Sequence, residues 1–187
     1  MVRVIAGSQK GKQLKVLDIV TRPLTDRIKS SVFDLIVNYI PESSILDLFG
    51  GSGNFAIEAL SRGANSATIL EKDDKAVNII KENLVKTGLT SKVKVLGRNT
   101  FVFLASKDVT ITFDIIFLDP PFDFTIEDKQ KLLNLSGKFL KNENPDALII
   151  FRYPKTETYR TKTTHEIYSK IYGISKVSFF KRKIKQL

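Results

Sequence analysis

The stretch SILDLFGGSGNFAIEALSRG, residues 44–63, decides the fold class. It begins as a short apolar strand, continues through a glycine-rich turn over residues 50–53, and ends as a helix that stops at Gly63. Glycines between a strand and a helix allow a tight turn and a close approach of the backbone to a ligand. The free N–H groups at the start of the helix favour an anion, such as a carboxylate or a phosphate. A turn that only joins strand to helix is the alternative interpretation.

Strands and helices alternate through the rest of this region. Apolar runs predict strands at residues 66–70, 92–96, 113–118 and 146–151. Helical spacing predicts helices between them, over residues 73–88, 101–107 and 125–140. Gly88 is placed to end the first, and Thr125 with Asp128 resembles a capping box for the last. This alternation is typical of βαβ units, so we predict an α/β fold with a mainly parallel sheet.

The two ends of the chain depart from this alternation. Short strands at residues 2–5 and 12–17 flank a turn, and a helix follows that begins near Thr25 or Asp26 and stops at Pro41. We therefore predict a basic N-terminal hairpin and helix extension, residues 1–43, and a core, residues 44–187. Residues from HEIYSKIYG to VSFFKRKIK predict an antiparallel C-terminal hairpin.

Composition excludes several kinds of chemistry. The 187 residues contain one histidine and no cysteine, which argues against thiolate zinc sites, disulfides, cysteine nucleophiles and histidine metal sites, so no metal is expected. The net charge of +10 indicates a polyanionic partner, nucleic acid first and an acidic membrane second. No apolar run approaches the ~20 residues of a membrane span, and the N-terminus lacks the apolar core of a signal peptide. We expect a soluble, cytoplasmic protein.

An acid at the end of the second core strand supports a nucleoside ligand. Glu71 lies 18 residues after Gly53, close to the ~20-residue interval at which an acid reaches a ribose hydroxyl. The turn reads GGSGNF, which lacks the full GxGxxG, and it lacks the Lys-Ser/Thr of a phosphate-binding loop. S-adenosylmethionine, a nucleoside with a carboxylate, therefore fits better than NAD or ATP. Asn99, with Thr100 beside it, follows the third strand and would contact the adenine or cap a helix.

The segment FLDPPF, residues 117–122, ends the fourth core strand with an acid and two prolines. Prolines restrict the backbone and carry no N–H, so the segment is stiff and rich in acceptors. The Asp119 carboxylate and the Pro120 carbonyl could each accept one N–H of an exocyclic base amine, and Phe122 could stack on the base. The nitrogen lone pair would then point at a methyl donor. Alignment of the amine, the methyl group and the sulfonium leaving group would supply much of the rate. A proline turn with Asp119 as a local cap is the alternative.

Together these motifs resemble the Rossmann-like S-adenosylmethionine-dependent methyltransferases, and more closely the RsmD-type family of bacterial 16S ribosomal RNA guanine-N2 methyltransferases. The resemblance covers nearly the whole chain and is carried, in order, by RVIAGSQKGKQL, RPLTDRIKSSVFDLI, LDLFGGSGNFAIEALSRGA, FLDPPF and the YG of IYGISKVSFF. It implies a mostly parallel seven-stranded sheet with a C-terminal antiparallel strand.

The resemblance also implies a substrate and a set of site residues. The substrate would be a guanine of 16S rRNA, within a 30S subunit or an assembly intermediate, and the enzyme would be a monomer. The catalytic segment would be Asp119, Pro120, Pro121 and Phe122. The cofactor residues would be Asp47, Phe49, Gly50, Gly51, Gly53, Glu71, Lys72, Asn99, Thr100, Arg22 and Thr25. The chain departs from the family pattern at Leu24, Lys29 and Ser30.

Basic residues of the extension are candidates for RNA contact. We expect a positive rim near the pocket, formed by Arg3, Lys10, Lys12, Lys15 and Arg27 together with Arg22. Such contacts with phosphates would position the RNA and weaken with salt. The C-terminal KRKIK either adds to this rim or protects an edge strand.

Three other functions share part of this pattern. An adenine-N6 methyltransferase would use the same DPP acceptors, although the chain shows no separate recognition domain. A protein glutamine methyltransferase generally has Asn at position 119. A non-catalytic RNA-binding module is the alternative of a different class, and the intact Gly50, Gly53, Glu71 and Asp119 argue against it.

Overall fold

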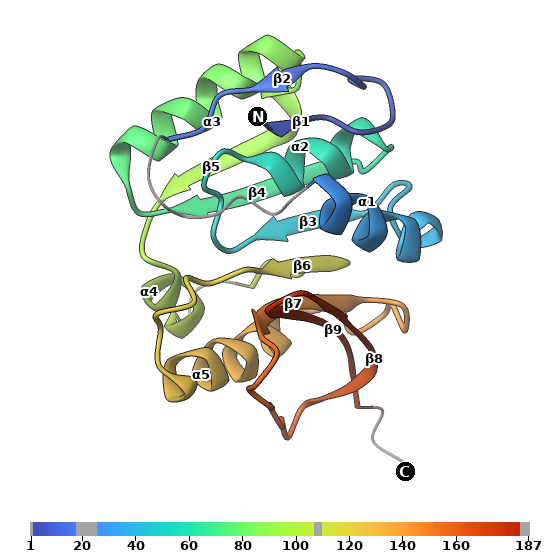
Figure 1. Ribbon diagram of the computed structural model, residues 1–187, viewed down its shortest axis with the longest axis vertical. Coiled ribbons are helices and arrows are strands. Elements are labelled where there is room, and N and C mark those ends of the chain that lie inside the picture. The colour runs from blue at the N-terminus through green and yellow to red at the C-terminus, as the bar shows by residue number, and fades with distance from the viewer. Residues whose placement is uncertain (1, 18–25, 107–109, 184–187) are drawn as a thin grey trace. The chain divides into compact units, whose positions relative to one another are not determined.

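The computed structural model describes residues 2–17, 26–106 and 110–183 (Figure 1). They form two compact units, Met1–Thr100 and Phe101–Leu187. We predicted a different boundary, between an extension (residues 1–43) and a core (residues 44–187). That boundary stays a prediction.

The first unit contains three parallel strands in the order β5-β4-β3. They are β3 (Ser44–Asp47), β4 (Ser66–Glu71) and β5 (Val93–Gly97). Helix α2 (Asn54–Ser61) joins the first two, and α3 (Asp74–Thr87) joins the second and third. Asp73 caps α3 by accepting the N–H of Ala76 at 2.8 Å, and Gly88 ends it with a φ of 71°, as predicted.

The N-terminal extension packs within the first unit. Its strands β1 (Val2–Arg3) and β2 (Gln13–Leu14) are antiparallel and shorter than predicted, and α1 (Asp26–Leu35) follows with the short 3-10 turn η1 (Val37–Tyr39). The β2 side of the hairpin lies beside α3 (Figure 1), where Asn83 bonds both backbone groups of Lys15, accepting from its N–H at 2.8 Å and donating to its carbonyl at 3.0 Å.

A fully buried ion pair joins the extension to α2. The Lys29 ammonium lies 3.2 Å from the Glu58 carboxylate, and neither side chain is exposed. Lys29 also donates to the carbonyl of Arg3 at 2.5 Å and to Oδ1 of Asn54 at 2.6 Å. Glu58 accepts the N–H groups of Ile5 and Ala6, at 2.8 and 3.0 Å. Burial lowers the pKa of Lys29, and the charge of Glu58 opposes that shift.

The described residues of the second unit form four strands in the order β6-β7-β9-β8. They are β6 (Ile115–Leu118), β7 (Leu148–Pro154), β8 (Thr164–Tyr172) and β9 (Ser175–Arg182). Strands β6 and β7 are parallel, and β9 pairs antiparallel with both β7 and β8, which confirms the predicted C-terminal hairpin. The alternative that KRKIK protects an edge strand fails for Lys181 and Arg182, which belong to the inner strand β9, while Ile184 and Lys185 lie outside the described residues. Strand β9 lies between β7 and β8 because its apolar residues, among them Phe179 and Phe180, are buried.

Two helices complete the second unit. Helix α4 (Thr100–Ala105) begins at its boundary, and α5 (Ile126–Ser136) is followed by the 3-10 turn η3 (Gly137–Phe139). Thr125 caps α5 by accepting the N–H of Asp128 at 3.1 Å, as the sequence predicted. Both units thus have the predicted α/β character, with parallel strands joined by helices. Across the described residues, no helix is long and apolar enough to cross a membrane.

The buried pair predicts the cost of uncoupling the extension. Changing Glu58→Gln leaves the Lys29 charge buried without its counter-ion, so we expect the free energy of unfolding to fall by about 3–5 kcal/mol. Urea denaturation measures this change. Lys15→Ala is the control, because Lys15 pairs with Glu82 at an exposed site, where such pairs contribute below about 1 kcal/mol. An equally small fall in the free energy of unfolding in Glu58→Gln and Lys15→Ala would contradict this role of Glu58.

Candidate active site

The glycine turn after β3 is held by backbone hydrogen bonds, one to β4 and one within the turn. The N–H of Gly50 donates to the carbonyl of Leu70 at 2.8 Å, and the N–H of Gly53 donates to the carbonyl of Gly50 at 2.7 Å. A Cβ on Gly50 would lie 2.3 Å from Cγ2 of Ile69. Gly51 and Gly53 have φ values of 54° and 77°, which other residues rarely adopt. The turn therefore needs glycine for two reasons, close packing at Gly50 and the left-handed backbone at Gly51 and Gly53.

Glu71 ties the end of β4 to this turn. Its Oε2 accepts the N–H of Gly51 and its Oε1 accepts the N–H of Asp73, both at 2.9 Å. Each carboxylate oxygen has a second acceptor position, so Glu71 can hold the turn and still accept bonds from two hydroxyl groups. The spacing in the sequence indicated an acid near a ribose. The bond to Gly51 is set by the pairing of β3 with β4, which carried no sequence signal.

The remaining cofactor candidates of the first unit fall into two groups. Asp47 and Thr100 are buried, and the Thr100 hydroxyl donates to the carbonyl of Leu48 at 2.6 Å. Lys72 and Asn99 are exposed, and Phe49 is half-buried. Their contact with a cofactor stays a prediction. Arg22 and Thr25, with Leu24, lie outside the described residues.

The DPPF segment of the second unit follows a strand that is buried over its whole length. Pro120 is buried, Pro121 is exposed, and Phe122 is half-buried. A backbone bond of 3.2 Å from the N–H of Phe124 to the carbonyl of Pro121 closes the turn. The four predicted catalytic residues are therefore presented on one short, stiff turn.

Arg152 of β7 contacts this segment at two points. Its Nε donates to Oδ1 of Asp119 at 2.7 Å, and its Cζ lies 4.8 Å from the centre of the Phe122 ring. Burial raises the pKa of Asp119, and the positive charge of Arg152 opposes that rise. Arg152 was not among the predicted site residues. Its one signal in the sequence is its place directly after the buried run DALIIF. If that strand lies next to the strand before Asp119, the two strand ends place Arg152 beside Asp119.

Lys129 of α5 contacts the other end of the segment. Its side chain is fully buried, and its ammonium donates to the carbonyl of Phe122 and to Oε1 of Glu157, both at 3.0 Å. The Tyr159 hydroxyl also donates to Glu157, and burial, with this acceptor, raises the pKa of Tyr159 well above its usual range. The lysine had no sequence signal beyond its place on a helix.

The candidate RNA residues differ in how firmly they are held. The Arg3 guanidinium lies 3.4 Å from Asp26, Lys15 pairs with Glu82, and the Lys12 ammonium donates to the carbonyl of Lys86 at 3.1 Å. Lys10 and Arg27 are exposed. Contact of these residues with RNA stays a prediction.

Comparison with known proteins identifies the family. The family profile described as "Conserved hypothetical protein 95" matches residues 2–181. A protein of Haemophilus influenzae named ribosomal RNA small subunit methyltransferase D is 38% identical over 167 residues, which are 88% of this chain and 83% of the relative. The chain belongs to this family. The RsmD-type resemblance is thus confirmed.

Two further relatives support the RsmD-type assignment. YlbH of Bacillus subtilis, named as a candidate rRNA methyltransferase, is 36% identical and covers 97% of this chain and 100% of its own. The structure of yhhF from Escherichia coli, named as a candidate methyltransferase, has a TM-score of 0.82 at 30% identity, with 98% of this chain and 99% of that chain covered. The predicted fold class, a Rossmann-like α/β methyltransferase fold, is confirmed.

The packing of Gly50 predicts the effect of a single methyl group. Gly50→Ala forces the Ile69 side chain or the turn to move, at a cost of about 1–3 kcal/mol, and we expect affinity for S-adenosylmethionine to fall about tenfold or more. Isothermal calorimetry measures this affinity. Gly11→Ala is the control, because Gly11 has a φ of 85° but lies outside the turn, and a Cβ added there would have no atom within 4 Å. Unchanged affinity in Gly50→Ala would contradict this account.

Proposed function

We propose that the chain transfers a methyl group from S-adenosylmethionine to the N2 amine of a guanine in 16S rRNA. The observation that carries the proposal is the DPPF turn, where the Asp119 carboxylate stands at the end of a buried strand in a chain of the RsmD-type family. A relative named for methylation of small-subunit rRNA supports the choice of RNA.

The first unit suits the cofactor. Glu71 would accept bonds from the ribose hydroxyls, and the exposed backbone of Gly51 would allow close approach of the ligand. The first N–H groups of α2 would favour the ligand's carboxylate, because no side chain of the N-cap residue, Gly53, occupies them. S-adenosylmethionine supplies an electrophilic methyl carbon bound to a sulfonium sulfur.

The second unit suits the amine. The Asp119 carboxylate and the Pro120 carbonyl would each accept one N–H of the guanine amine, so that its lone pair points away from the ring plane. The nitrogen then forms a bond to the methyl carbon as the carbon–sulfur bond breaks, and the nitrogen loses one proton. The Asp119 carboxylate would accept that proton, because it is more basic than the Pro120 carbonyl, and Phe122 would stack on the base.

RNA would be positioned by charge. A net charge of +10 favours phosphate contacts, and a guanine in a duplex must leave the stack before its amine can enter a pocket. The substrate would be a 30S subunit or an assembly intermediate, the enzyme would act as a monomer, and its place would be the cytoplasm. Adenine-N6 methylation is the competing activity, since it would use the same acceptors.

Methyl transfer to 30S subunits that lack the modification tests the activity. We expect tritium from labelled S-adenosylmethionine to appear as N2-methylguanosine after nucleoside analysis. Asp119→Ala should lower kcat about a hundredfold or more, because it removes a charged acceptor from the reacting amine. Asp123→Ala, at an exposed position directly after the DPPF segment, should leave kcat unchanged. N6-methyladenosine as the product would overturn the choice of base.

Salt dependence tests the RNA-binding rim. Lys10→Ala should reduce the slope of log affinity against log salt by about 0.7, the value for one lost contact with a single strand. Filter binding of the RNA substrate over a range of salt measures the slope. Lys162→Ala removes the same charge from an exposed position of the second unit and should leave the slope unchanged. Equal slopes in the wild type and Lys10→Ala would remove Lys10 from the interface.

A further inference from the structure

Arg152 contacts two parts of the DPPF turn, and the proposed chemistry gives it no role. Its Nε bonds Oδ1 of Asp119 at 2.7 Å, and its guanidinium carbon lies 4.8 Å from the Phe122 ring centre. We propose that Arg152 is a positioning residue for methyl transfer, which orients the Asp119 carboxylate so that Oδ2 receives the amine, and which holds the Phe122 ring against the base. This inference rests on the proposed function.

The position of Arg152 follows from strand register. Strands β6 and β7 are parallel, and Leu118 pairs with Phe151, so the next residues on each strand are Asp119 and Arg152. Neighbouring residues in a parallel pair extend to the same face of the sheet. Strand β7 is also paired on its other side, where Arg152 is opposite Val177 of β9. The guanidinium is therefore carried by an inner strand, which is a rigid support.

The chemistry of arginine suits this double contact. A planar guanidinium can donate in its plane to a carboxylate while its face lies on an aromatic ring. A lysine ammonium is a point charge and cannot make both contacts in one fixed geometry. The side chains of Arg152 and Asp119 are only 17% and 18% exposed, so the pair is little screened by water.

The contact also keeps Asp119 an acceptor. A protonated carboxyl would present an O–H toward the amine, whereas the carboxylate accepts with both oxygens. Burial favours protonation of Asp119 by raising its pKa, and Arg152 counteracts it. Among the described residues, the charged groups near the segment include Asp123, which directly follows it, Lys129 of α5 and Glu157, which is paired with Lys129. On β9, Lys176 pairs with Glu166.

Lys129 anchors the opposite end of the same turn. Its buried ammonium bonds the carbonyl of Phe122 at 3.0 Å and is neutralised by Glu157. Arg152 thus holds the turn at Asp119, and both Arg152 and Lys129 hold it at Phe122. Such support from neighbouring side chains keeps reacting groups in a productive geometry, where a displacement of about 1 Å can cost on the order of a hundredfold in rate.

Arg152→Met and Arg152→Lys separate the positioning role from simple charge. We expect Arg152→Met to lower kcat about tenfold to a hundredfold without changing the KM for S-adenosylmethionine. The acid limb of its kcat profile should move to higher pH, because Asp119 without the neighbouring cation becomes protonated at higher pH. Arg152→Lys should keep the acid limb near that of the wild type but still lose kcat.

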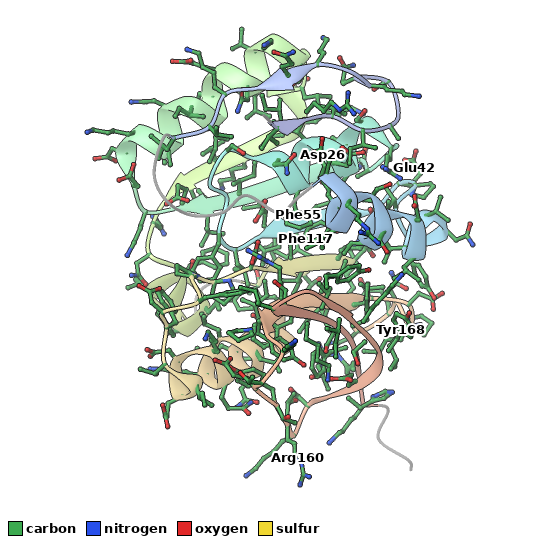
Figure 2. All side chains as sticks on the ribbon, in the orientation of Figure 1. Asp26, Glu42, Phe55, Phe117, Arg160 and Tyr168 are labelled. Atoms are coloured by element: carbon green, nitrogen blue, oxygen red, sulfur yellow. The ribbon has the colours of Figure 1, made fainter. Side chains whose placement is uncertain are left out.

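Arg160→Met is the matched control. Arg160 projects from the segment after β7 (Figure 2), its side chain is exposed, and its loss removes the same charge from the same unit. It should leave both kcat and the acid limb at the wild-type values. A fall in kcat equal to that of Arg152→Met would mean that only the net charge matters, and this would overturn the proposal.

A second readout does not need activity. In protein labelled with carbon-13 at aspartate carboxyls, the Asp119 signal, assigned with Asp119→Asn, should titrate at higher pH in Arg152→Met than in the wild type. Loss of kcat without a shift of the acid limb or of this titration would show a structural role and overturn the proposal. If Arg152→Met does not fold, wild-type kcat in Arg152→Lys overturns it. If the wild type methylates neither guanine nor adenine in 30S RNA, the proposed function fails. The carbon-13 titration of Asp119 still tests the Arg152–Asp119 pair in that case.

Discussion

A carboxylate at the end of a buried strand needs hydrogen-bond donors, and both candidate sites are built around such a carboxylate. Glu71 ends β4 and finds the backbone N–H groups of Gly51 and Asp73. Asp119 follows β6 and finds the guanidinium of Arg152. Backbone donors leave a carboxylate ready for further hydroxyl groups, whereas a cation also stabilises its charge. This difference supports the two ligands that we propose, a ribose for Glu71 and an amine for Asp119.

The buried Lys29–Glu58 pair has a comparable role for the N-terminal extension. Lys29 is a position at which we expect the chain to depart from the family pattern, and its side chain is buried and bonded to Arg3 and Asn54 as well as to Glu58. Asn54 is the first residue of α2 and directly follows the glycine turn. The same network therefore fixes the extension and the helix start that the cofactor would approach. Such a network is stabilising only when every member is bonded, which makes the fit of Lys29 to its partners specific.

Support for the DPPF turn comes from residues that carry no motif. Prolines restrict the backbone locally, but they do not determine where the Asp119 carboxylate or the Phe122 ring points. Arg152 and Lys129 supply that information from β7 and α5. The relatives that share the fold give the family and the reaction class, and the geometry of this turn supports the chemistry that we propose for it.

The sequence by itself determined the features that depend on neighbours along the chain. Alternation of apolar runs with helical periods predicted the α/β fold, and local chemistry predicted the Thr125 cap, the Gly88 terminus and the glycine turn. Only the tertiary structure decided which distant residues meet. Arg152 lies 33 positions after Asp119, and Lys29 lies 29 positions before Glu58, so no local pattern links either pair. The inner position of β9 also depends on distant residues, because it follows from the burial of its phenylalanines and from pairing with β7.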